Sequence, residues 1–410
     1  MLNTVYKLAS GSIANRLKKH INKLVSIDQT GFISNRYIGE NTRLIYDIMH
    51  FTEEEDIPGL LLLLDFEKAF DTISWKFIQS ALNYFNFGPS IKEWIRIFYY
   101  NITSAVIQGG NISETFNIQR GCRQGDPLSP YIFLFCAEIL AIMIRKNNNI
   151  KGISVRNVGK KISQLADDTS IILDGSRESL LETVRTLNKF SELSGLSINS
   201  SKTHAVWIGA KRFSQDIIHS DLNFSWGNSR FTLLGIHFDV DLQKIPQINY
   251  EPKMIQIKAI ISQWRKRYLT PIGKITVLKS LVLSLLNHIL MSIPNPNNTF
   301  CKELEKLFYS FVWNSPSHRI KKDVITKPYE KGGLRMINIS AYIASLKIFW
   351  IRQLIFTNKG LDLFIPNLDM IKLTTCGTDY VLEVKKTLKN AFWIDIFNAW
   401  LDLGKKRWPY

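Results

Sequence analysis

Cysteine, acidic residues and long apolar runs are all scarce in this chain. Its 410 residues include only four cysteines, which lie far apart and form no Cys-x-x-Cys pair. This spacing excludes a cysteine zinc site and a disulfide framework, and it indicates a reducing compartment. Polar residues interrupt the apolar stretches before they reach the roughly 18 residues that a membrane span needs, and the first residues lack a secretory signal. We therefore expect an intracellular protein that is not embedded in a membrane.

The shortage of acidic residues leaves the chain strongly basic. Lys and Arg number 52 against 35 Asp and Glu, which gives a formal net charge of +17 at pH 7. Such an excess favours a polyanionic partner, most often a nucleic acid, although an anionic membrane surface or an ordinary basic protein has the same signature. Hydrophobic residues make up 45% of the sequence, which excludes wholesale disorder and suits two or three domains.

The apolar pattern predicts an α+β fold, with helices and antiparallel strands up to about residue 240 and mainly helix beyond. Leu60–Leu64 is a wholly apolar run typical of a buried strand, and Ser129–Lys146 is apolar nearly all round, as in a buried helix. Ile293–Asn298 has the Pro and Asn content of a linker. Further helices are expected near residues 13–24, 41–52, 75–85, 91–100 and 178–193, and strands near 104–108, 115–119, 162–165, 170–173, 204–208 and 231–238.

Three aspartates stand next to predicted strands. Asp65 follows the leucine run directly, while Asp167 and Asp168 separate two short apolar strands. Adjacent carboxylates repel each other unless a cation lies between them, and carboxylate oxygens are the ligands that Mg²⁺ prefers. Two such ions could activate an attacking oxygen and stabilise a leaving one in phosphoryl transfer. A capped strand end and a polar hairpin turn are the alternatives that each site leaves open.

A glycine-containing loop, Arg120–Pro130, precedes the predicted buried helix. Its two glycines allow a backbone to approach a ligand closely, and Arg120 and Arg123 suit phosphate. Asp126 is placed to cap the following helix, with Pro127 at its first position. The alternative is a Gly/Pro loop that only opens a core helix.

Six segments in chain order resemble the motifs of one family, and they are residues 29–36, 65–71, 120–130, 166–168, 194–203 and 233–236. Together they resemble the reverse transcriptases of non-LTR (LINE-type) retrotransposons. The resemblance covers essentially all of residues 1–240 and, more loosely, the rest. It implies a right-hand polymerase fold, with fingers and palm in residues 1–240, a helical thumb in 241–298 and a helical C-terminal region in 299–410.

The resemblance also implies roles for individual residues. Asp65 and Asp167 would be the principal ligands of two catalytic Mg²⁺ ions, with Mn²⁺ as an alternative ion and Asp168 as the neighbouring carboxylate. Phe70 falls where the family places the aromatic ring that blocks a ribose 2′-hydroxyl. The remaining implied contacts are Gln124 and Gly125 beneath the incoming nucleotide and template base, Arg36 on the triphosphate, and Lys202 on the pyrophosphate.

The excess of positive charge is concentrated in the implied thumb. Residues 251–290 hold seven basic residues and one acidic residue, a net charge of +6 on a helical stretch. We expect this stretch to contact the phosphates of the template–primer, and a solvated helix face is the alternative. The predicted contacts are Arg265, Lys266, Arg267 and Lys274.

The chain departs from the family pattern at several points. Leu165 stands where the family more often has Phe or Tyr before the paired aspartates. The family's Arg-Pro pair is absent before the residues that match Leu2–Tyr6, and neither an endonuclease nor a C-terminal Cys/His cluster is found. We therefore expect a truncated element product whose fingers are incomplete.

The main hypothesis is an RNA-directed DNA polymerase that takes an RNA template, a DNA primer and dNTPs, and acts in the nucleus. A related alternative is a maturase-type or other domesticated reverse transcriptase. The alternative from another class is a catalytically inactive, truncated relic that binds nucleic acid. A third is a fragment that does not fold alone. The sequence does not define the oligomeric state.

Overall fold

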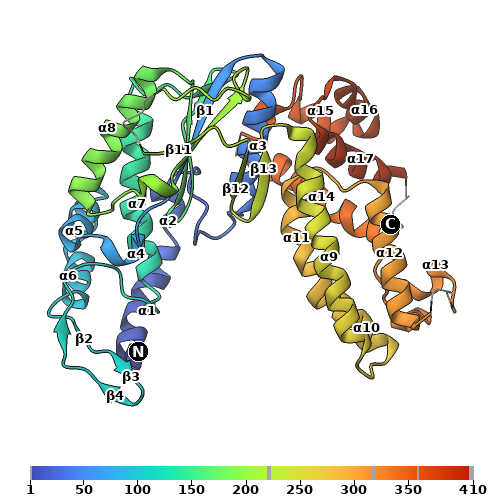
Figure 1. Ribbon diagram of the computed structural model, residues 1–410, viewed down its shortest axis with the longest axis horizontal. Helices are drawn as coiled ribbons and strands as arrows, with labels where there is room; N and C mark the ends of the chain where they lie inside the picture. The colour runs from blue at the N-terminus through green and yellow to red at the C-terminus, as the bar shows by residue number, and fades with distance from the viewer. Residues whose placement is uncertain (1, 219–222, 316–318, 358–359, 406–410) are drawn as a thin grey trace. The chain divides into compact units, whose positions relative to one another are not determined.

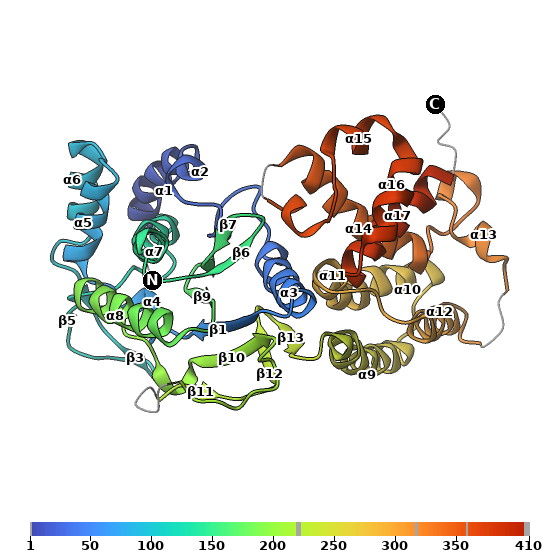
Figure 2. The ribbon, with the colours of Figure 1, turned by 90° about the horizontal axis from the view of Figure 1, so that it is seen from above.

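The computed structural model describes residues 2–218, 223–315, 319–357 and 360–405. The chain divides into two compact units (Figures 1 and 2). The N-terminal unit comprises residues 1–44 and 52–229, and the C-terminal unit comprises residues 45–51 and 230–410. Helix α3, Gly39–Glu54, therefore supplies residues to both. The predicted limits of fingers and palm, thumb and C-terminal region stay predictions.

Within the described residues of the N-terminal unit, five strands form one sheet in the order β11-β10-β1-β9-β8. The central strand β1 (Pro58–Leu64) is antiparallel to β10 (His204–Gly209) on one side and to β9 (Asp168–Leu173) on the other. The outer strands are β8 (Ile162–Leu165) and β11 (Ser225–Trp226). The leucine run thus forms the buried central strand, as predicted.

Three helices form the main core of this unit with the sheet. They are α5 (Trp75–Tyr84), α7 (Ser129–Lys146) and α8 (Arg177–Ser194), which pack on one another beside the sheet (Figure 2). Leu60, Leu62 and Leu64 of β1 share one buried cluster with residues of these helices. Because side chains alternate along a strand, the helices cover the face of β1 that carries its even-numbered leucines.

Smaller elements complete the N-terminal unit. The helix expected near 13–24 is broken at Lys19 and His20 into α1 and α2, although Ile13, Leu17 and Ile21 are still buried as an amphipathic pattern predicts. The bounds of these smaller elements are α1 (Thr4–Lys18), α2 (Ile21–Leu24), α4 (Ala69–Thr72), α6 (Pro89–Phe98), η1 (Ser200–Lys202), β2 (Thr103–Ser104), β3 (Ile107–Gln108), β4 (Asn111–Ile112), β5 (Phe116–Asn117), β6 (Ile153–Val155) and β7 (Val158–Lys160).

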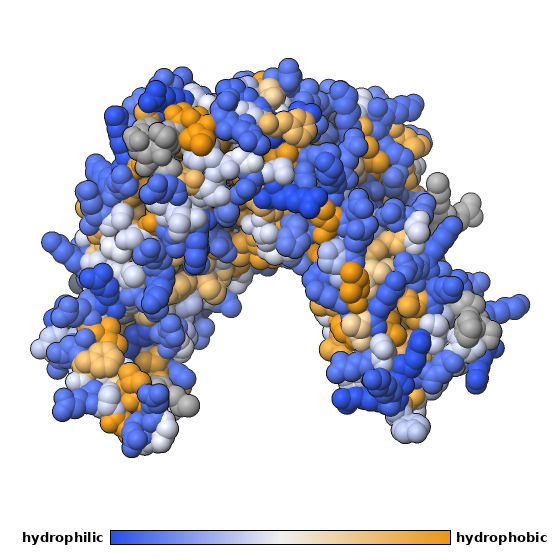
Figure 3. Space-filling view, viewed as in Figure 1, coloured by the Kyte–Doolittle hydropathy of each residue, from blue (hydrophilic) through white to orange (hydrophobic). Residues whose placement is uncertain are grey.

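Apolar side chains gather on the surface around β2–β5 (Figure 3). Ile107 and Ile112, at the tip of the β3–β4 hairpin, are each about 70% exposed, and Phe116 is 50% exposed. The strands expected near 104–108 and 115–119 therefore form one hairpin in two short ladders, β2 with β5 and β3 with β4, and the side chains of these strands contribute little to the core.

The C-terminal unit opens with a hairpin and continues as helices. The expected strand region 231–238 forms β12 (Arg230–Leu233) and β13 (Ile236–Asp239). The hairpin that the family resemblance implies at 233–236 has its turn at Leu234 and Gly235, which both take a positive φ. The helical elements are η2 (Leu242–Lys244), α9 (Ile245–Arg265), α10 (Pro271–Val277), η3 (Leu278–Val282), α11 (Leu283–Ser292), α12 (Asn298–Trp313), α13 (Lys322–Ile325), η4 (Tyr329–Lys331), α14 (Ile339–Phe356), η5 (Asp362–Phe364), α15 (Met370–Thr375), α16 (Gly377–Thr387) and α17 (Ala391–Lys405). The predicted linker at 293–298 lies between α11 and α12.

A buried polar contact joins the two ends of this unit's sequence. Asp47, on α3, accepts hydrogen bonds from Asn390 Nδ2 at 2.8 Å and from Trp393 Nε1 at 3.1 Å. Asp47, Asn390 and Trp393 are all buried. The segment 45–51 is thus held by residues that follow it by more than 300 positions.

Two helical stretches of the C-terminal unit, Pro271–Ser292 and Ile339–Phe356, are long and apolar enough to cross a membrane by length and composition alone. Their mean hydropathies are 1.6 and 1.3. The polar residues that were expected to exclude a span are too few to lower this hydropathy. Core helices of soluble proteins also reach such values, and half of the first stretch is buried. The expected absence of a membrane partner stays a prediction.

Candidate active site

Strand pairing brings the three predicted catalytic aspartates to one edge of the sheet. Leu64 of β1 is paired with Thr169 of β9, so Asp65 and Asp168 occupy the next position of the same antiparallel register. Leu165 pairs with Asp168 to close the β8–β9 hairpin, which leaves Ala166 and Asp167 as its two-residue loop. The end of a buried strand and the tip of a hairpin therefore place the three aspartates at neighbouring backbone positions.

The carboxyl group of Asp168 interacts electrostatically with the other two. Partial desolvation raises the pKa of Asp168, and the negative charges of Asp167 and Asp65 raise it further. Among the described residues, no group of three or more His, Cys, Asp or Glu side chains lies together so that it could hold a metal ion. Mg²⁺ does not need such a cage, because it is commonly held by one or two carboxylates and completes its shell with water and phosphate oxygens. The oxygen-only donor set and its mutual repulsion thus fit a divalent cation.

The segment after the hairpin lies directly against the Asp65 segment. The Asn199 amide donates to the Asp65 carbonyl and the Glu67 amide donates to the Ser197 carbonyl, at 2.8 and 2.9 Å. The Asn199 side chain caps η1, where Lys202 is the last residue. Lys202 is exposed at this turn. Two motifs that are more than 120 residues apart in the sequence are therefore neighbours at the site.

Phe70 projects from the short helix α4, just beyond Asp65. Its ring is stacked on that of Phe133, with centroids 4.3 Å apart, and meets the ring of Phe32 edge-on at 6.4 Å. The Cys122 amide donates to the Phe70 carbonyl at 2.6 Å. Contacts on both the ring and the backbone fix the orientation of Phe70.

The glycine loop packs on the residues that follow Asp65. A Cβ atom at Gly121 would lie 2.6 Å from the Asp71 carbonyl oxygen, so only glycine allows this approach. The exposed Gln124 donates to an Asp71 carboxylate oxygen at 3.2 Å, and Gly125 has a φ of +77°. A cavity of about 470 Å³ opens here, and its polar lining includes Asp71, Arg120, Arg123 and Gln124.

The start of helix α7 differs from the prediction. The helix begins at Ser129, so Pro127 is not at its first position. Asp126 is buried and accepts from the Leu128 amide at 3.1 Å and from the hydroxyls of Ser129 and Tyr6. Asp126 lies two residues before the N-cap Leu128, and its carboxylate therefore stabilises the turn before the helix.

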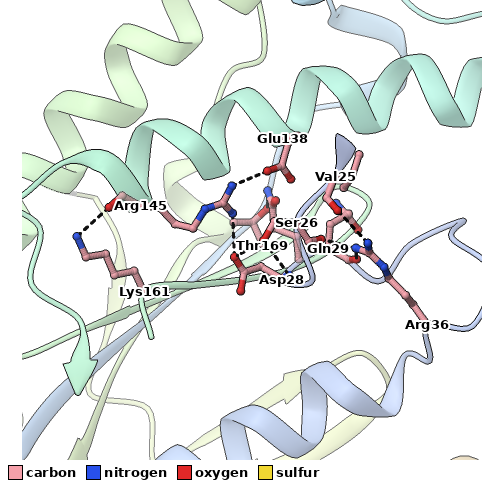
Figure 4. A network of polar contacts seen from close by, with 10 residues as sticks. Val25, Ser26, Asp28, Gln29, Arg36, Glu138, Arg145, Lys161 and Thr169 are labelled. Carbon is pink, nitrogen blue, oxygen red and sulfur yellow. Dashed lines mark hydrogen bonds and ion pairs between the residues drawn. The ribbon is translucent and has the colours of Figure 1, made fainter. Parts of the chain in front are cut away.

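Arg36 belongs to a polar network around the segment 25–29 (Figure 4). Its guanidinium donates to the carbonyls of Val25, Ser26 and Gln29, and burial lowers its pKa. The implied triphosphate contact of Arg36 stays a prediction, and in this conformation the side chain serves the protein backbone.

Arg145, on α7, completes the same network. It donates to the carboxylates of Asp28 and Glu138, and Glu138 is buried. Lys161 caps the end of α7 by donating to the carbonyls of Arg145 and Asn147 (Figure 4). The sequence predicts Arg145 only as a cation in the last turn of this helix. Its ion-pair partners are 117 and 7 residues away, and nothing local in the sequence marks them.

The four predicted phosphate contacts lie in the C-terminal unit. Arg265, Lys266 and Arg267 are exposed at the end of α9, with the Arg267 guanidinium 4.6 Å from the centre of the Trp264 ring. Lys274, in contrast, is 4% exposed, and its ammonium donates to Asn314 Oδ1 at 2.8 Å. The structure therefore presents three of these cations to solvent and points the fourth into the unit.

The sequence of this fold matches a known protein family. The family model described as "Reverse transcriptase (RNA-dependent DNA polymerase)" matches residues 1–238. The chain belongs to the reverse transcriptase family, so the predicted α+β, right-hand polymerase fold is confirmed.

Proteins of mobile elements and telomerase are among those similar to this chain. A 149 kDa protein of transposon TX1 from Xenopus laevis is 22% identical, covering 87% of this chain and 27% of the relative. A Pol polyprotein from type-1 retrotransposable element R2 of Nasonia vitripennis is 24% identical, covering 93% and 36%. The chain thus spans about a third or less of these relatives, and the predicted non-LTR retrotransposon origin is confirmed. The structure of telomerase from Candida tropicalis, solved with a TWJ fragment of telomeric RNA, aligns with 88% of this chain and with 56% of the telomerase chain. The sequence identity is 12% and the TM-score is 0.45.

Proposed function

We propose that this chain is an RNA-directed DNA polymerase that extends a DNA primer on an RNA template. The observation that carries the proposal is the meeting of Asp65, Asp167 and Asp168 at one sheet edge, in a chain of the reverse transcriptase family. The reaction forms a bond between the primer 3′-oxygen and the α-phosphorus of a dNTP, and it breaks the bond to pyrophosphate. The 3′-hydroxyl proton is lost as the new bond forms.

Asp65 and Asp167 would hold two Mg²⁺ or Mn²⁺ ions, with Asp168 beside them. Bound ions of this kind promote ionisation of the attacking hydroxyl and neutralise charge on the leaving pyrophosphate. The protein's own contribution is to place the carboxylates on rigid elements and to align the substrates, since no protein nucleophile is required. Lys202, exposed beside the Asp65 segment, would neutralise pyrophosphate, and Gln124, held by Asp71, would lie under the nucleotide.

Phe70 would exclude ribonucleotides. Because its ring is held between Phe133 and Phe32, it cannot turn aside readily to admit a 2′-hydroxyl. We expect Phe70→Val to raise the ratio of kcat/KM for rUTP to that for dTTP by roughly ten- to two-hundredfold. Single-nucleotide extension measures this ratio, in which any loss of folded protein cancels. An unchanged ratio in an active variant would remove Phe70 from this role.

The C-terminal unit would bind the template–primer backbone. Arg265, Lys266 and Arg267 are the exposed cations that support this part of the proposal. Each phosphate contact displaces counterions, so the affinity should fall steeply as salt rises. The nuclear site of action belongs to the same proposal and follows from the family alone.

The proposal is tested by primer extension on poly(rA)·oligo(dT) with dTTP, in Mg²⁺ and in excess EDTA. We expect extension with Mg²⁺ and none with EDTA. A thermal melt and a duplex-binding assay on the same preparation establish that the chain is folded and bound. A folded chain that binds the duplex in a salt-dependent way but adds no nucleotide with Mg²⁺ or Mn²⁺ would be the inactive relic, and the proposal would be wrong.

A further inference from the structure

Gln29 lies against the loop that carries Asp167. Its side chain is fully buried, and its carboxamide makes two hydrogen bonds with Ala166, the residue before Asp167. The Ala166 amide donates to Gln29 Oε1 at 2.7 Å, and Gln29 Nε2 donates to the Ala166 carbonyl at 3.2 Å. One side chain thus binds both backbone polar groups of a single loop residue.

Ala166 needs this support because of its backbone conformation. It has a φ of +55°, which an L-residue with a Cβ adopts at a cost. It is also 7% exposed, so its amide and carbonyl are largely withheld from water. The two loop residues of such a hairpin lie outside the ladder of strand hydrogen bonds. Without Gln29, the left-handed conformation would lose the contacts that favour it.

The segment that carries Gln29 is itself held firmly. It runs parallel to β8, since the Gln164 amide donates to the Asp28 carbonyl at 2.8 Å and the Thr30 amide donates to the Gln164 carbonyl at 2.9 Å. Arg36 donates to the Gln29 carbonyl at 2.6 Å (Figure 4). The approach is so close that a Cβ atom at Gly31 would lie 2.6 Å from the Ala166 nitrogen. Gln29 is therefore held in a fixed position against the loop.

We propose that Gln29 is a positioning residue that sets the backbone of Ala166 and thereby the direction in which Asp167 presents its carboxylate to the metal ions. This inference rests on the proposed function. The carbonyl of Asp167 is anchored from the other side by the Thr169 hydroxyl at 3.2 Å. Two anchors on adjacent loop residues leave the Asp167 side chain few directions to take.

Gln29→Met tests the inference, because methionine fills a similar volume and forms neither hydrogen bond to Ala166. Thr30→Val is the matched control, since it removes buried hydrogen bonds to Asn41 and to the Gln164 carbonyl from the same segment without touching Ala166. The first readout is Mn²⁺ binding measured by electron paramagnetic resonance without nucleotide. The specific Mn²⁺ sites are those that are lost in Asp167→Asn. The second readout is the split between kcat and KM for dTTP.

We expect Gln29→Met to weaken specific Mn²⁺ binding at least tenfold and to lower kcat, with duplex affinity within twofold of the parent. Thr30→Val should lower the melting temperature but keep Mn²⁺ binding within twofold. Parental Mn²⁺ binding in Gln29→Met, or equal weakening in Thr30→Val, would reduce Gln29 to a structural residue. If the parent protein is inactive but Gln29→Met still weakens its Mn²⁺ binding, the polymerase proposal is wrong and the positioning role of Gln29 is retained.

Adding Ala166→Gly keeps the inference testable if Gln29→Met folds poorly. Glycine takes a positive φ without the cost that alanine bears. The double variant Gln29→Met/Ala166→Gly should therefore recover part of the melting temperature and part of the Mn²⁺ affinity. Recovery of stability with no gain in Mn²⁺ affinity would count against the positioning role.

Discussion

Asp167→Asn is expected to reduce primer extension by about 10³-fold or more, because it removes a charged oxygen ligand from the ions that stabilise the transition state. Asparagine keeps the size of the side chain and can occupy the same loop position. The measurement is single-turnover incorporation of dTTP on poly(rA)·oligo(dT). The loss should appear in kcat, because Asp167 acts on the charge that develops during the reaction.

Asp174→Asn is the matched control for this substitution. Asp174 follows the far end of β9 and accepts hydrogen bonds from the amide and hydroxyl of Ser176, so its loss weakens a turn without touching the candidate site. We expect this variant to keep nearly all of the activity. Substantial extension by Asp167→Asn, from a preparation free of parental protein, would show that Asp167 is not a ligand of the catalytic ions.

Arg145→Met is expected to destabilise the N-terminal unit by about 3 kcal/mol, because removing one partner of a buried ion pair leaves the other charge uncompensated. The Glu138 side chain is 2% exposed and the Asp28 side chain 18%, while Arg145 keeps 31% exposure, which places the effect at the lower end for such pairs. The midpoint of thermal unfolding should fall by roughly 6–12 °C.

The pH dependence of this loss identifies its cause. Burial raises the pKa of Glu138 even with Arg145 beside it, and removing Arg145 takes away the interactions that lower that pKa. A carboxyl group whose folded-state pKa is raised favours the folded state at low pH, and this contribution is lost as pH rises through that pKa. The deficit of Arg145→Met should therefore be smaller at pH 5 than at pH 8. Adding Glu138→Gln to Arg145→Met should recover part of the stability at pH 8. A loss of stability that depends neither on pH nor on Glu138→Gln would contradict this explanation.

Local pattern was sufficient to predict the elements that are buried on all sides. The leucine run before Asp65 and the apolar stretch 129–146 leave few alternatives, because only a central strand and a core helix can bury such segments. The carboxylates at their ends were recognisable for the same reason. Their convergence, however, depends on the pairing of β1 with β9, and only the resemblance between motifs in order gave it.

Polar residues that serve the backbone were beyond sequence reasoning. Gln29 and Arg36 stood inside a recognised motif, yet their bonds to Ala166 and to three carbonyls depend on tertiary contacts that no local pattern marks. Lys274 illustrates the converse. A charge count places it with the exposed cations of its stretch, whereas the structure buries its ammonium against Asn314.

The hydrogen bonds that Asn390 and Trp393 donate to Asp47 can form only after these two residues have been synthesised. Asn390 follows Asp47 by 343 residues, so a ribosome has to add these residues before helix α3 meets this partner. Contacts between such distant residues form late and slowly. A stop codon before residue 390 would therefore remove the last helix and also leave the segment 45–51 without two of its hydrogen-bond donors. Synthesis through residue 393 is therefore a condition for helix α3 to gain these two contacts.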